Sequence, residues 1–322
     1  MTQATAQAHP NIALVKYWGK RDTALNLPAT GSVSMTLDVF PTTTTVQVDA
    51  SAAEDEFILN DVLRDGVPAE RTRRFLDIVR AMAGTDARAR VTSHNTVPSA
   101  AGLASSASGF AALAGAAAAA YGLDLDDRQL SRLARRGSGS AARSIFGGFA
   151  LWHAGDDEES FAEPLAAPAD LAMVVTIVDA GEKQVSSREA MRRTALTSPY
   201  YPAWVSSTEQ SLAAAQEAFR DADVARIGRI TETNALRMHA AIQGSDPSIR
   251  YLSPTSVAIF DRVEQLRAEG LTVFATADAG PNVVALCLAE EAPAVDAALA
   301  AFAETVIAHP GPGLRLVAEG EQ

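Results

Sequence analysis

Hydrophobic and polar residues follow one another along the chain with periods that predict both strands and helices. Residues 11–15 are almost entirely apolar, which predicts a buried strand. Residues 42–48 are β-branched and partly alternating, as expected of a strand with one face in solvent. Residues 58–59 and 89–93 predict two more short strands, whereas residues 70–79 have the apolar spacing of a helix.

A run of small apolar residues at 108–121 predicts a helix that is buried on every side, because the run offers no polar face. It should end at Gly122, a residue type that readily forms a helix C-terminus. Residues 98–107 predict a loop that leads into this helix. Its glycine and serines would let a phosphate approach the backbone and the positive end of the helix. An ordinary N-capped core helix is the alternative.

Strands and helices also follow one another in the rest of the chain. An acidic, proline-containing stretch without periodicity at residues 156–169 marks a domain boundary. We therefore predict an α+β protein with domains at residues 1–168 and 169–322. The remaining predicted strands are 149–153, 171–178, 272–277, 283–288 and 314–318. The remaining predicted helices are 126–136, 202–220, 223–240, 254–270 and 292–308.

The composition is that of a folded chain without an internal disulfide. The 322 residues are 48% hydrophobic and include one cysteine, Cys287. Residues 1–9 are polar and have no signal-peptide core, and no apolar run is long enough to cross a bilayer. We therefore expect a cytoplasmic protein.

The charge pattern narrows the class of partner. A net charge of −12 and a pI of about 4.9 argue against nucleic acid and anionic membranes as partners, so an anionic substrate would need a locally basic pocket. Of the 27 basic residues only three are lysines, namely Lys16, Lys20 and Lys183. Because arginine fills the other basic positions, lysine is expected where a compact ammonium has a role. The alternative is that the three lysines are retained by chance and share no function.

Three short segments carry candidate chemistry. Two lysines and an arginine within residues 16–21 would repel one another unless an anion lies between them. Small and hydroxyl residues at 137–142 precede the lone Arg143 and could bind a second anion. Asp278 follows an apolar strand, and its carboxylate could face a cleft. The plainer alternatives are a solvated loop, a glycine-rich turn and a turn-forming aspartate. No histidine has a partner at the spacing of a metal site.

The loop at 98–107 is neither a Walker A sequence nor a dinucleotide fingerprint. Its pattern Pro-x-x-x-Gly-Leu-x-Ser-Ser-Ala resembles the central motif of the GHMP kinase superfamily. Residues 11–22, Asn-Ile-Ala-x-x-Lys-Tyr-Trp-Gly-Lys-Arg-Asp, are similar to the signature of the diphosphomevalonate decarboxylase family. Residues 137–144, 179–188 and 278–282 resemble that family too, in the same order and across both domains.

This resemblance implies a two-domain GHMP kinase-like fold, with a ribosomal-protein-S5-domain-2-like first domain and a ferredoxin-like second domain. It implies ATP-dependent decarboxylation of (R)-5-diphosphomevalonate to isopentenyl diphosphate, ADP, phosphate and CO2. ATP and Mg2+ would be needed, without a metal site made by the protein alone. We expect a homodimer that binds neither nucleic acid nor membranes.

The resemblance also implies a role for individual residues. Asp278 would orient the substrate 3-hydroxyl and accept its proton, while Lys16 would hold Asp278 and neutralise charge toward the γ-phosphate. Arg143, assisted by Asn11, would pair with the substrate carboxylate. The substrate-binding residues would be Tyr17, Trp18, Gly19, Lys20, Arg71, Ser138, Gly139, Ser140, Ala141, Ala142 and Arg188. The residues that hold ATP with magnesium would be Gly102, Leu103, Ala104, Ser105 and Ser106.

One departure from the family pattern follows the second-domain loop. Some relatives carry an arginine directly before x-Thr-Ser, whereas this chain has Ala195 there and Arg192 and Arg193 upstream. This keeps open a sister enzyme that acts on mevalonate 5-phosphate or phosphorylates the 3-hydroxyl without decarboxylation. A nucleotide-binding protein without turnover is the more distant alternative. The joint presence of the three expected catalytic groups argues against both.

Overall fold

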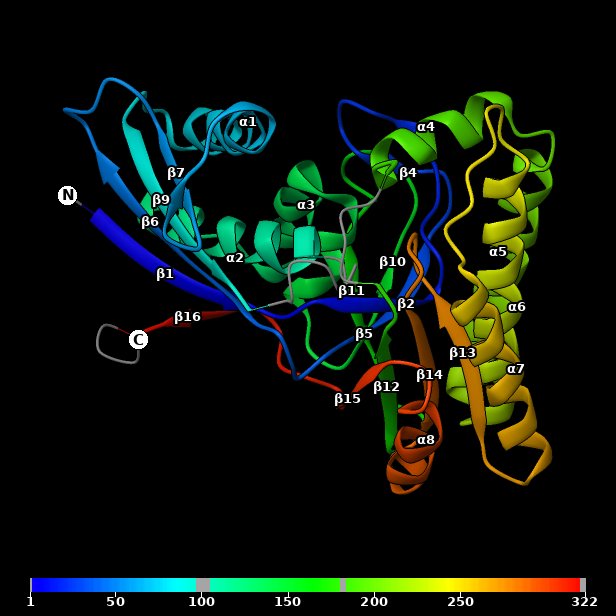
Figure 1. The fold of residues 1–322 in the computed structure, drawn as a ribbon. Helices are drawn as coiled ribbons and strands as arrows, with labels where there is room; N and C mark the ends of the chain where they lie inside the picture. The colour runs from blue at the N-terminus through cyan, green and yellow to red at the C-terminus, as the bar shows by residue number, and fades with distance from the viewer. Residues whose placement is uncertain (1, 97–104, 180–183, 319–322) are drawn as a thin grey trace.

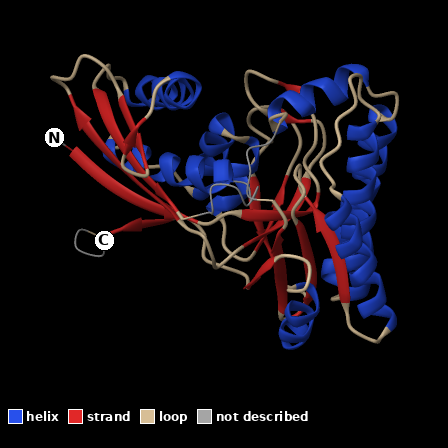
Figure 2. Ribbon diagram, viewed as in Figure 1, coloured by secondary structure: helices blue, strands red, loops and turns tan. Residues whose placement is uncertain are grey.

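The computed structural model describes residues 2–96, 105–179 and 184–318. These residues form an elongated mixed α/β molecule. Helices α5, α6 and α7 stand together at one end, and the strands of the largest sheet lie at the other (Figures 1 and 2). Over the described residues, no helix combines the length and apolar character that crossing a membrane requires.

Strands from near both ends of the chain meet in the largest sheet, whose order is β16-β1-β6-β9-β7-β8. β1 is antiparallel to β6 on one side and to β16 on the other, with Thr5 opposite Val317. The sequence did not predict β1, because its inward residues are small alanines. The strands are β1 (Thr2–Ala8), β6 (Thr42–Asp49), β7 (Glu56–Leu59), β8 (Val62–Leu63), β9 (Arg88–Asn95) and β16 (Arg315–Val317).

The predicted all-apolar helix is α2 (Ser105–Ala120), which packs on β1 and β6. It is buried along most of its length, and Gly122 has a φ of +72°, as expected just beyond a helix end. On its other side lie α3 (Asp127–Gly137) and the 3-10 helix η1 (Gly139–Ile145). A capping box between Asp126 and Gln129 starts α3. Helix α1 (Gly66–Ala83) covers the outer part of this layer.

A second sheet has the order β11-β10-β5-β2. Residues 156–169 were expected to lack regular structure, but residues 162–165 form β11. Pairing with β10 stabilises β11 despite its weak local pattern. The strands are β2 (Asn11–Val15), β5 (Ser32–Thr36), β10 (Phe149–Trp152) and β11 (Ala162–Leu165), and β3 (Lys20–Asp22) and β4 (Leu27–Pro28) form a separate ribbon.

The third sheet has the order β13-β14-β12-β15. Its predicted strands are confirmed, but the predicted helix over 292–308 is wrong in its second half. There α8 ends at Leu299, and residues 304–308 form β15 against β12, because β-branched residues at 305–307 favour a strand. The strands are β12 (Leu171–Ile177), β13 (Val273–Ala277), β14 (Val283–Leu288) and β15 (Glu304–Ala308).

Helices cover this third sheet and connect it to the second. The predicted pair α5 and α6 is confirmed, and α6 contacts both β13 and β2, which belong to different sheets. Ser253 caps α7 through a capping box with Ser256. The remaining helical segments are α4 (Ser187–Thr197), α5 (Tyr201–Arg220), α6 (Val224–Gln243), α7 (Pro254–Ala268), η2 (Ala289–Glu291) and α8 (Ala292–Leu299).

Candidate active site

A buried ion pair joins the second and third sheets. Lys16 follows β2 and Asp278 follows β13, and the Lys16 Nζ donates to Asp278 Oδ1 at 2.6 Å and to the Ala13 carbonyl at 2.8 Å. Burial lowers the pKa of Lys16 and the nearby Arg143 adds to this, while Asp278 acts in the opposite direction. The side chain of Lys16 is 1% exposed and that of Asp278 is 30% exposed. The carboxylate is therefore the member of the pair that a ligand can reach.

Arg143 lies beside this pair, in η1. Its Nε and Nη2 donate to Asn11 Oδ1 at 3.1 and 3.0 Å, and its Nη1 donates to Ser32 Oγ at 2.7 Å. Burial lowers the pKa of Arg143 to about 10, with Asp278 opposing the shift, so the guanidinium is still charged at neutral pH. A guanidinium has five N–H hydrogens, so two are left for a carboxylate.

Asn11 holds Arg143 in one orientation. Its amide nitrogen donates to Ser144 Oγ at 2.7 Å and to the Ser140 carbonyl at 3.1 Å. Because these two contacts use the nitrogen, the amide oxygen must face Arg143. The structure thus brings Asn11, Lys16, Arg143 and Asp278 into one connected group.

Three cations form a second cluster. Lys20, Arg71 and Arg188 come from the start of β3, from α1 and from the first turn of α4. Burial, Arg188 and Arg71 lower the pKa of Lys20 to about 8, and burial, Arg188 and Arg74 lower the pKa of Arg71 to about 10. Within the described part of the chain, none of the three forms an ion pair with a carboxylate. Such a concentration of cations in an acidic protein is suited to a polyanionic ligand.

Two glycines allow aromatic rings to pack closely around this cluster. A Cβ on Gly139 would lie 2.8 Å from the Tyr17 hydroxyl, and a Cβ on Gly19, whose φ is +108°, would lie 2.0 Å from that of Tyr201. The Tyr17 hydroxyl has no hydrogen-bond partner among the described residues, and burial raises its pKa. It therefore keeps its proton and can donate to an anion.

Not every residue expected to bind substrate presents its side chain to the site. Trp18 is buried in an apolar cluster with Ile242, and its carbonyl accepts a hydrogen bond from Trp204 Nε1 at 2.9 Å. Ala141 and Ala142 are fully buried in the apolar cluster beside the first sheet. These three side chains therefore pack in the apolar core and support the site without facing it.

The serines expected near phosphate form a chain of hydroxyls. Ser106, in the first turn of α2, lies 3.2 Å from Ser138 Oγ, which lies 3.4 Å from Ser140 Oγ. Ser105 is the first residue of the helix. The other residues expected in the nucleotide loop, Gly102, Leu103 and Ala104, lie outside the described residues, as does Lys183.

The arginines near Ala195 have a partner within their own helix. Arg192 makes two contacts with Glu189, at 2.9 and 3.0 Å. Arg193 contacts the same carboxylate and the Pro247 carbonyl, each at 3.4 Å. Ala195 is exposed on α4. These contacts direct both arginines toward α4 and the adjoining loop.

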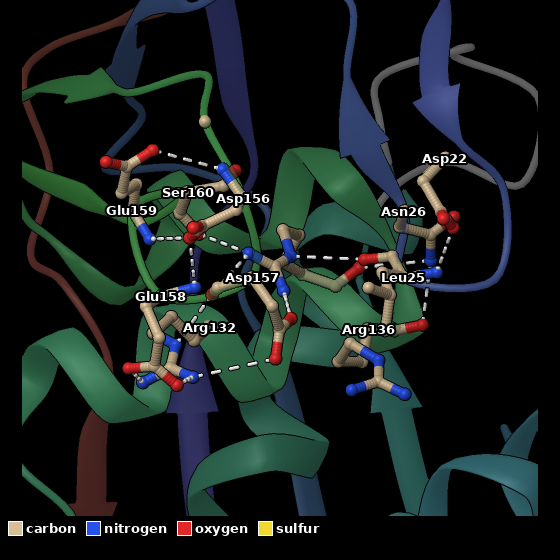
Figure 3. A network of polar contacts seen from close by, with 12 residues as sticks. Asp22, Leu25, Asn26, Arg132, Arg136, Asp156, Asp157, Glu158, Glu159 and Ser160 are labelled. Carbon is tan, nitrogen blue, oxygen red and sulfur yellow. Dashed lines mark hydrogen bonds and ion pairs between the residues drawn. The ribbon is translucent and has the colours of Figure 1, made fainter.

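Asn26 is a residue that the sequence analysis missed. Its oxygen accepts from Lys20 Nζ at 2.5 Å, and its nitrogen donates to the carbonyls of Arg135 and Arg136 at 3.1 and 2.7 Å. The buried Arg135 pairs with Asp157, and the network extends to residues 156–160 (Figure 3). A positive φ of 53° at Asn26 is the local feature that favours asparagine there. The end of α3 thereby orients Lys20.

Two family models together match most of the chain. Residues 8–162 match the model described as Diphosphomevalonate decarboxylase-like N-terminal domain, and residues 173–309 match Mevalonate 5-diphosphate decarboxylase C-terminal domain. The diphosphomevalonate decarboxylase of Aspergillus fumigatus is 38% identical over 317 residues, which cover 91% of this chain and 78% of the relative. That of Saccharomyces cerevisiae is 36% identical over 313 residues, covering 89% and 78%.

Solved structures agree with these matches over nearly the whole chain. One is described as MDDEF in complex with MVAPP, AMPPCP and magnesium; it has a TM-score of 0.94, 46% identity and coverage of 98% of this chain and 99% of that one. The mevalonate diphosphate decarboxylase from Staphylococcus aureus has a TM-score of 0.95, 41% identity and 98% coverage of both chains. The mixed α/β fold is therefore shared with these decarboxylases.

Proposed function

Because this chain belongs to the diphosphomevalonate decarboxylase family, we propose that it converts (R)-5-diphosphomevalonate and ATP into isopentenyl diphosphate, ADP, phosphate and CO2. The observation that carries this proposal is the ion pair of Lys16 and Asp278, placed beside Arg143. A cation cluster without carboxylate partners among the described residues accompanies it. One group of residues can handle the proton and the carboxylate, and the other can hold a diphosphate.

The first step transfers a phosphoryl group to the tertiary 3-hydroxyl of the substrate. The hydroxyl oxygen forms a bond to the γ-phosphorus, the bond to ADP breaks, and the hydroxyl proton passes to Asp278. Lys16 holds that carboxylate through the 2.6 Å contact and places a positive charge beside the transferred group. Asp278 can accept the proton because its carboxylate is partly exposed and a substrate hydroxyl can reach it.

The second step removes phosphate and CO2. The bond from the tertiary carbon to the phosphate oxygen breaks, and the electrons of the bond to the carboxylate form the new double bond. Arg143, with its two free N–H hydrogens, grips the carboxylate in the phosphorylated intermediate and then stabilises the departing phosphate. Asn11 keeps the guanidinium in place for both roles.

The remaining residues bind the two anionic ends of the substrates. We assign the diphosphate to Lys20, Arg71, Arg188 and the hydroxyl of Tyr17, and the ATP phosphates to the start of α2 with Ser105 and Ser106. Within the described residues, no three His, Cys, Asp or Glu side chains gather as a metal cage. Mg2+ would be held mainly by the phosphate oxygens, with the Ser106 hydroxyl as a candidate protein ligand, and it would neutralise phosphate charge.

The finer description of the fold and assembly is part of the same proposal. It comprises a GHMP kinase-like chain with an S5-domain-2-like part at residues 1–168 and a ferredoxin-like part at residues 169–322, from which β16 returns to pair with β1. The matched ranges, 8–162 and 173–309, support this division. We also propose a cytoplasmic homodimer. Light scattering of the purified protein tests the dimer, and cell fractionation tests the location.

The choice of substrate is the sharpest test of this function. Purified protein is incubated with ATP and either mevalonate 5-phosphate or 5-diphosphate, and ADP and CO2 are measured together. We expect equal amounts of both products with the diphosphate, and little of either with the monophosphate. ADP without CO2, or turnover of the monophosphate alone, would support the sister enzyme that Ala195 leaves open.

A further inference from the structure

Helix α6 contacts the backbone beside each member of the Lys16–Asp278 pair. Asn234 Oδ1 accepts the backbone N–H of Lys16 at 2.7 Å. His239 Nε2 lies 3.4 Å from the carbonyl of Ala277, the residue that precedes Asp278. Both side chains are buried. One helix therefore holds the two points from which the ion pair extends.

These two points lie on different sheets, which also pack together in one apolar cluster. Lys16 follows β2, an edge strand of the second sheet, and Asp278 follows β13, an edge strand of the third. The outer backbone groups of an edge strand have no neighbouring strand, and when buried they need another partner. Helix α6 runs alongside β13 (Figure 1) and also contacts β2. It therefore supplies partners to both edges at once.

The donor and acceptor roles of both side chains are fixed. The Asn234 nitrogen donates to Thr208 Oγ1 at 3.2 Å, so its oxygen is the atom that faces Lys16. A carbonyl can only accept, so this hydrogen bond requires the His239 tautomer with its proton on Nε2. Burial and the charge of Lys16 lower the pKa of His239 to about 4, against a smaller opposing effect of Asp278. The imidazole is therefore neutral near neutral pH, and its hydrogen bond to the Ala277 carbonyl does not change with pH there.

We propose that Asn234 and His239 are positioning residues that set the distance between Lys16 and Asp278. They are five residues apart, about 7.5 Å along the helix axis, so α6 acts as a spacer of fixed length between the two sheets. The inference rests on the proposed decarboxylase function, because the ion pair has its meaning in that reaction. Neither side chain contacts a reacting atom.

The test compares variants that keep and remove each contact. Asn234→Leu and His239→Leu remove the polar atoms at similar volume, while His239→Gln keeps an N–H near the position of Nε2. We expect both leucine variants to lower kcat by about 10- to 100-fold with KM for diphosphomevalonate changed by less than about threefold, because small misplacements of catalytic groups are costly. His239→Gln should recover most of kcat.

Thr231 provides the matched control. It lies on the same helix, is 1% exposed, and its hydroxyl has no hydrogen-bond partner among the described residues. Thr231→Val should leave kcat within about twofold of wild type, since it breaks no contact with either sheet. Thermal unfolding of every variant gives the folded fraction, so kcat is compared per folded enzyme.

A pH profile separates positioning from a purely structural role. When Lys16 moves away, the carboxylate takes up a proton more readily, so the acidic limb of log kcat should move to higher pH in the two leucine variants. Unchanged kcat and an unchanged limb in those variants would overturn the proposal, as would an equal loss in Thr231→Val. A wild-type protein that releases no CO2 would instead overturn the proposed function.

Discussion

At the scale of single residues, burial decides how the charges of this site behave. Lys16 and Arg143 are both removed from solvent, and each is held by a specific acceptor, Asp278 for the lysine and Asn11 for the arginine. Within the described ranges, the hydrogen-bond acceptor of Lys20 is the neutral oxygen of Asn26. Lys20 should therefore be the cation whose charge is most sensitive to pH and to bound anions.

The first residue-scale prediction concerns the proton acceptor. Asp278→Asn keeps the shape of the side chain but cannot accept a proton, so we expect kcat for both ADP and CO2 release to fall by about 10³-fold or more. Binding of diphosphomevalonate, measured by calorimetry, should persist. If the variant retained a tenth of wild-type decarboxylation, Asp278 would not be the base.

The second residue-scale prediction concerns Lys20. Its pKa of about 8 means that the free enzyme carries the charge below pH 8 and loses it above. Between pH 7 and 9, kcat/KM for diphosphomevalonate should therefore fall by about tenfold as the diphosphate loses its cation. In Lys20→Arg the guanidinium stays charged, so this fall should disappear. A wild-type profile level to pH 9 would contradict the lowered pKa.

At the scale of elements, buried polar contacts anchor helices that local propensity alone would leave loose. The end of α1 is fixed to the first sheet by Arg80, which makes two contacts with Asp55 at 2.9 and 3.0 Å. Asp55 also accepts the backbone N–H of Ala89 in β9. The side chains of Arg80 and Asp55 are 5% and 3% exposed. Without Asp55, the buried Arg80 would keep only the exposed Asp77, at 2.5 Å, as a carboxylate partner among the described residues.

We therefore predict that Asp55→Ala lowers the free energy of unfolding by about 3 kcal/mol. The exposed pair of Glu70 and Arg74 on the same helix provides the comparison, and Glu70→Ala should cost less than about 1 kcal/mol. Urea unfolding measures both. Similar losses of unfolding free energy in the two variants would show that the buried pair contributes no more to stability than the exposed pair.

Elements with a strong pattern of their own could be predicted from sequence, and those that depend on distant partners could not. The strands β2, β6, β12, β13 and β14 and the helices α2, α3, α5, α6 and α7 follow from periodicity and capping residues. By contrast, β5 reads Ser-Val-Ser-Met-Thr, and its polar residues are buried because Ser32 meets Arg143 and Thr36 meets the Phe146 carbonyl. Local sequence carries no sign of such partners.

The same limit applies to the candidate site. Motif resemblance pointed to Lys16, Arg143 and Asp278, but nothing local marks Asn234 or His239. The contact of Asn234 joins positions 218 residues apart. The burial of His239 would suit any packed helix residue, yet its neighbour in space is the Ala277 carbonyl. Tertiary contacts of this kind need a structure.

At the scale of the whole molecule, residues 311–317 tie the sheets together. The Gly311 N–H donates to the Thr36 carbonyl of the second sheet, and the Leu314 N–H donates to the Ile145 carbonyl. The segment then joins β1 as β16. A Cβ on Gly311 would lie 2.1 Å from the Leu37 backbone oxygen, so the chain at Gly311 packs directly against the backbone of Leu37. The segment fastens the second sheet to the first.

We predict that a chain ending after Pro310 loses at least about 3 kcal/mol of unfolding free energy, because several backbone hydrogen bonds and the burial of Leu314 against Gly115 disappear. A chain ending after Ala318 retains β16 and serves as the control, with stability near that of the full chain. Both are compared by thermal and urea unfolding. Equal stability of the two truncated chains would mean that β16 is dispensable.

The pairing of β1 with β16 also has a consequence for biosynthesis. The ribosome synthesises β1 long before β16, with almost all of the described chain between them. Until then, β1 has no neighbouring strand on the side that β16 later covers. Such an open edge is a template for pairing with other nascent chains. A chaperone that shields this edge during translation would therefore raise the yield of folded enzyme without any effect on its activity.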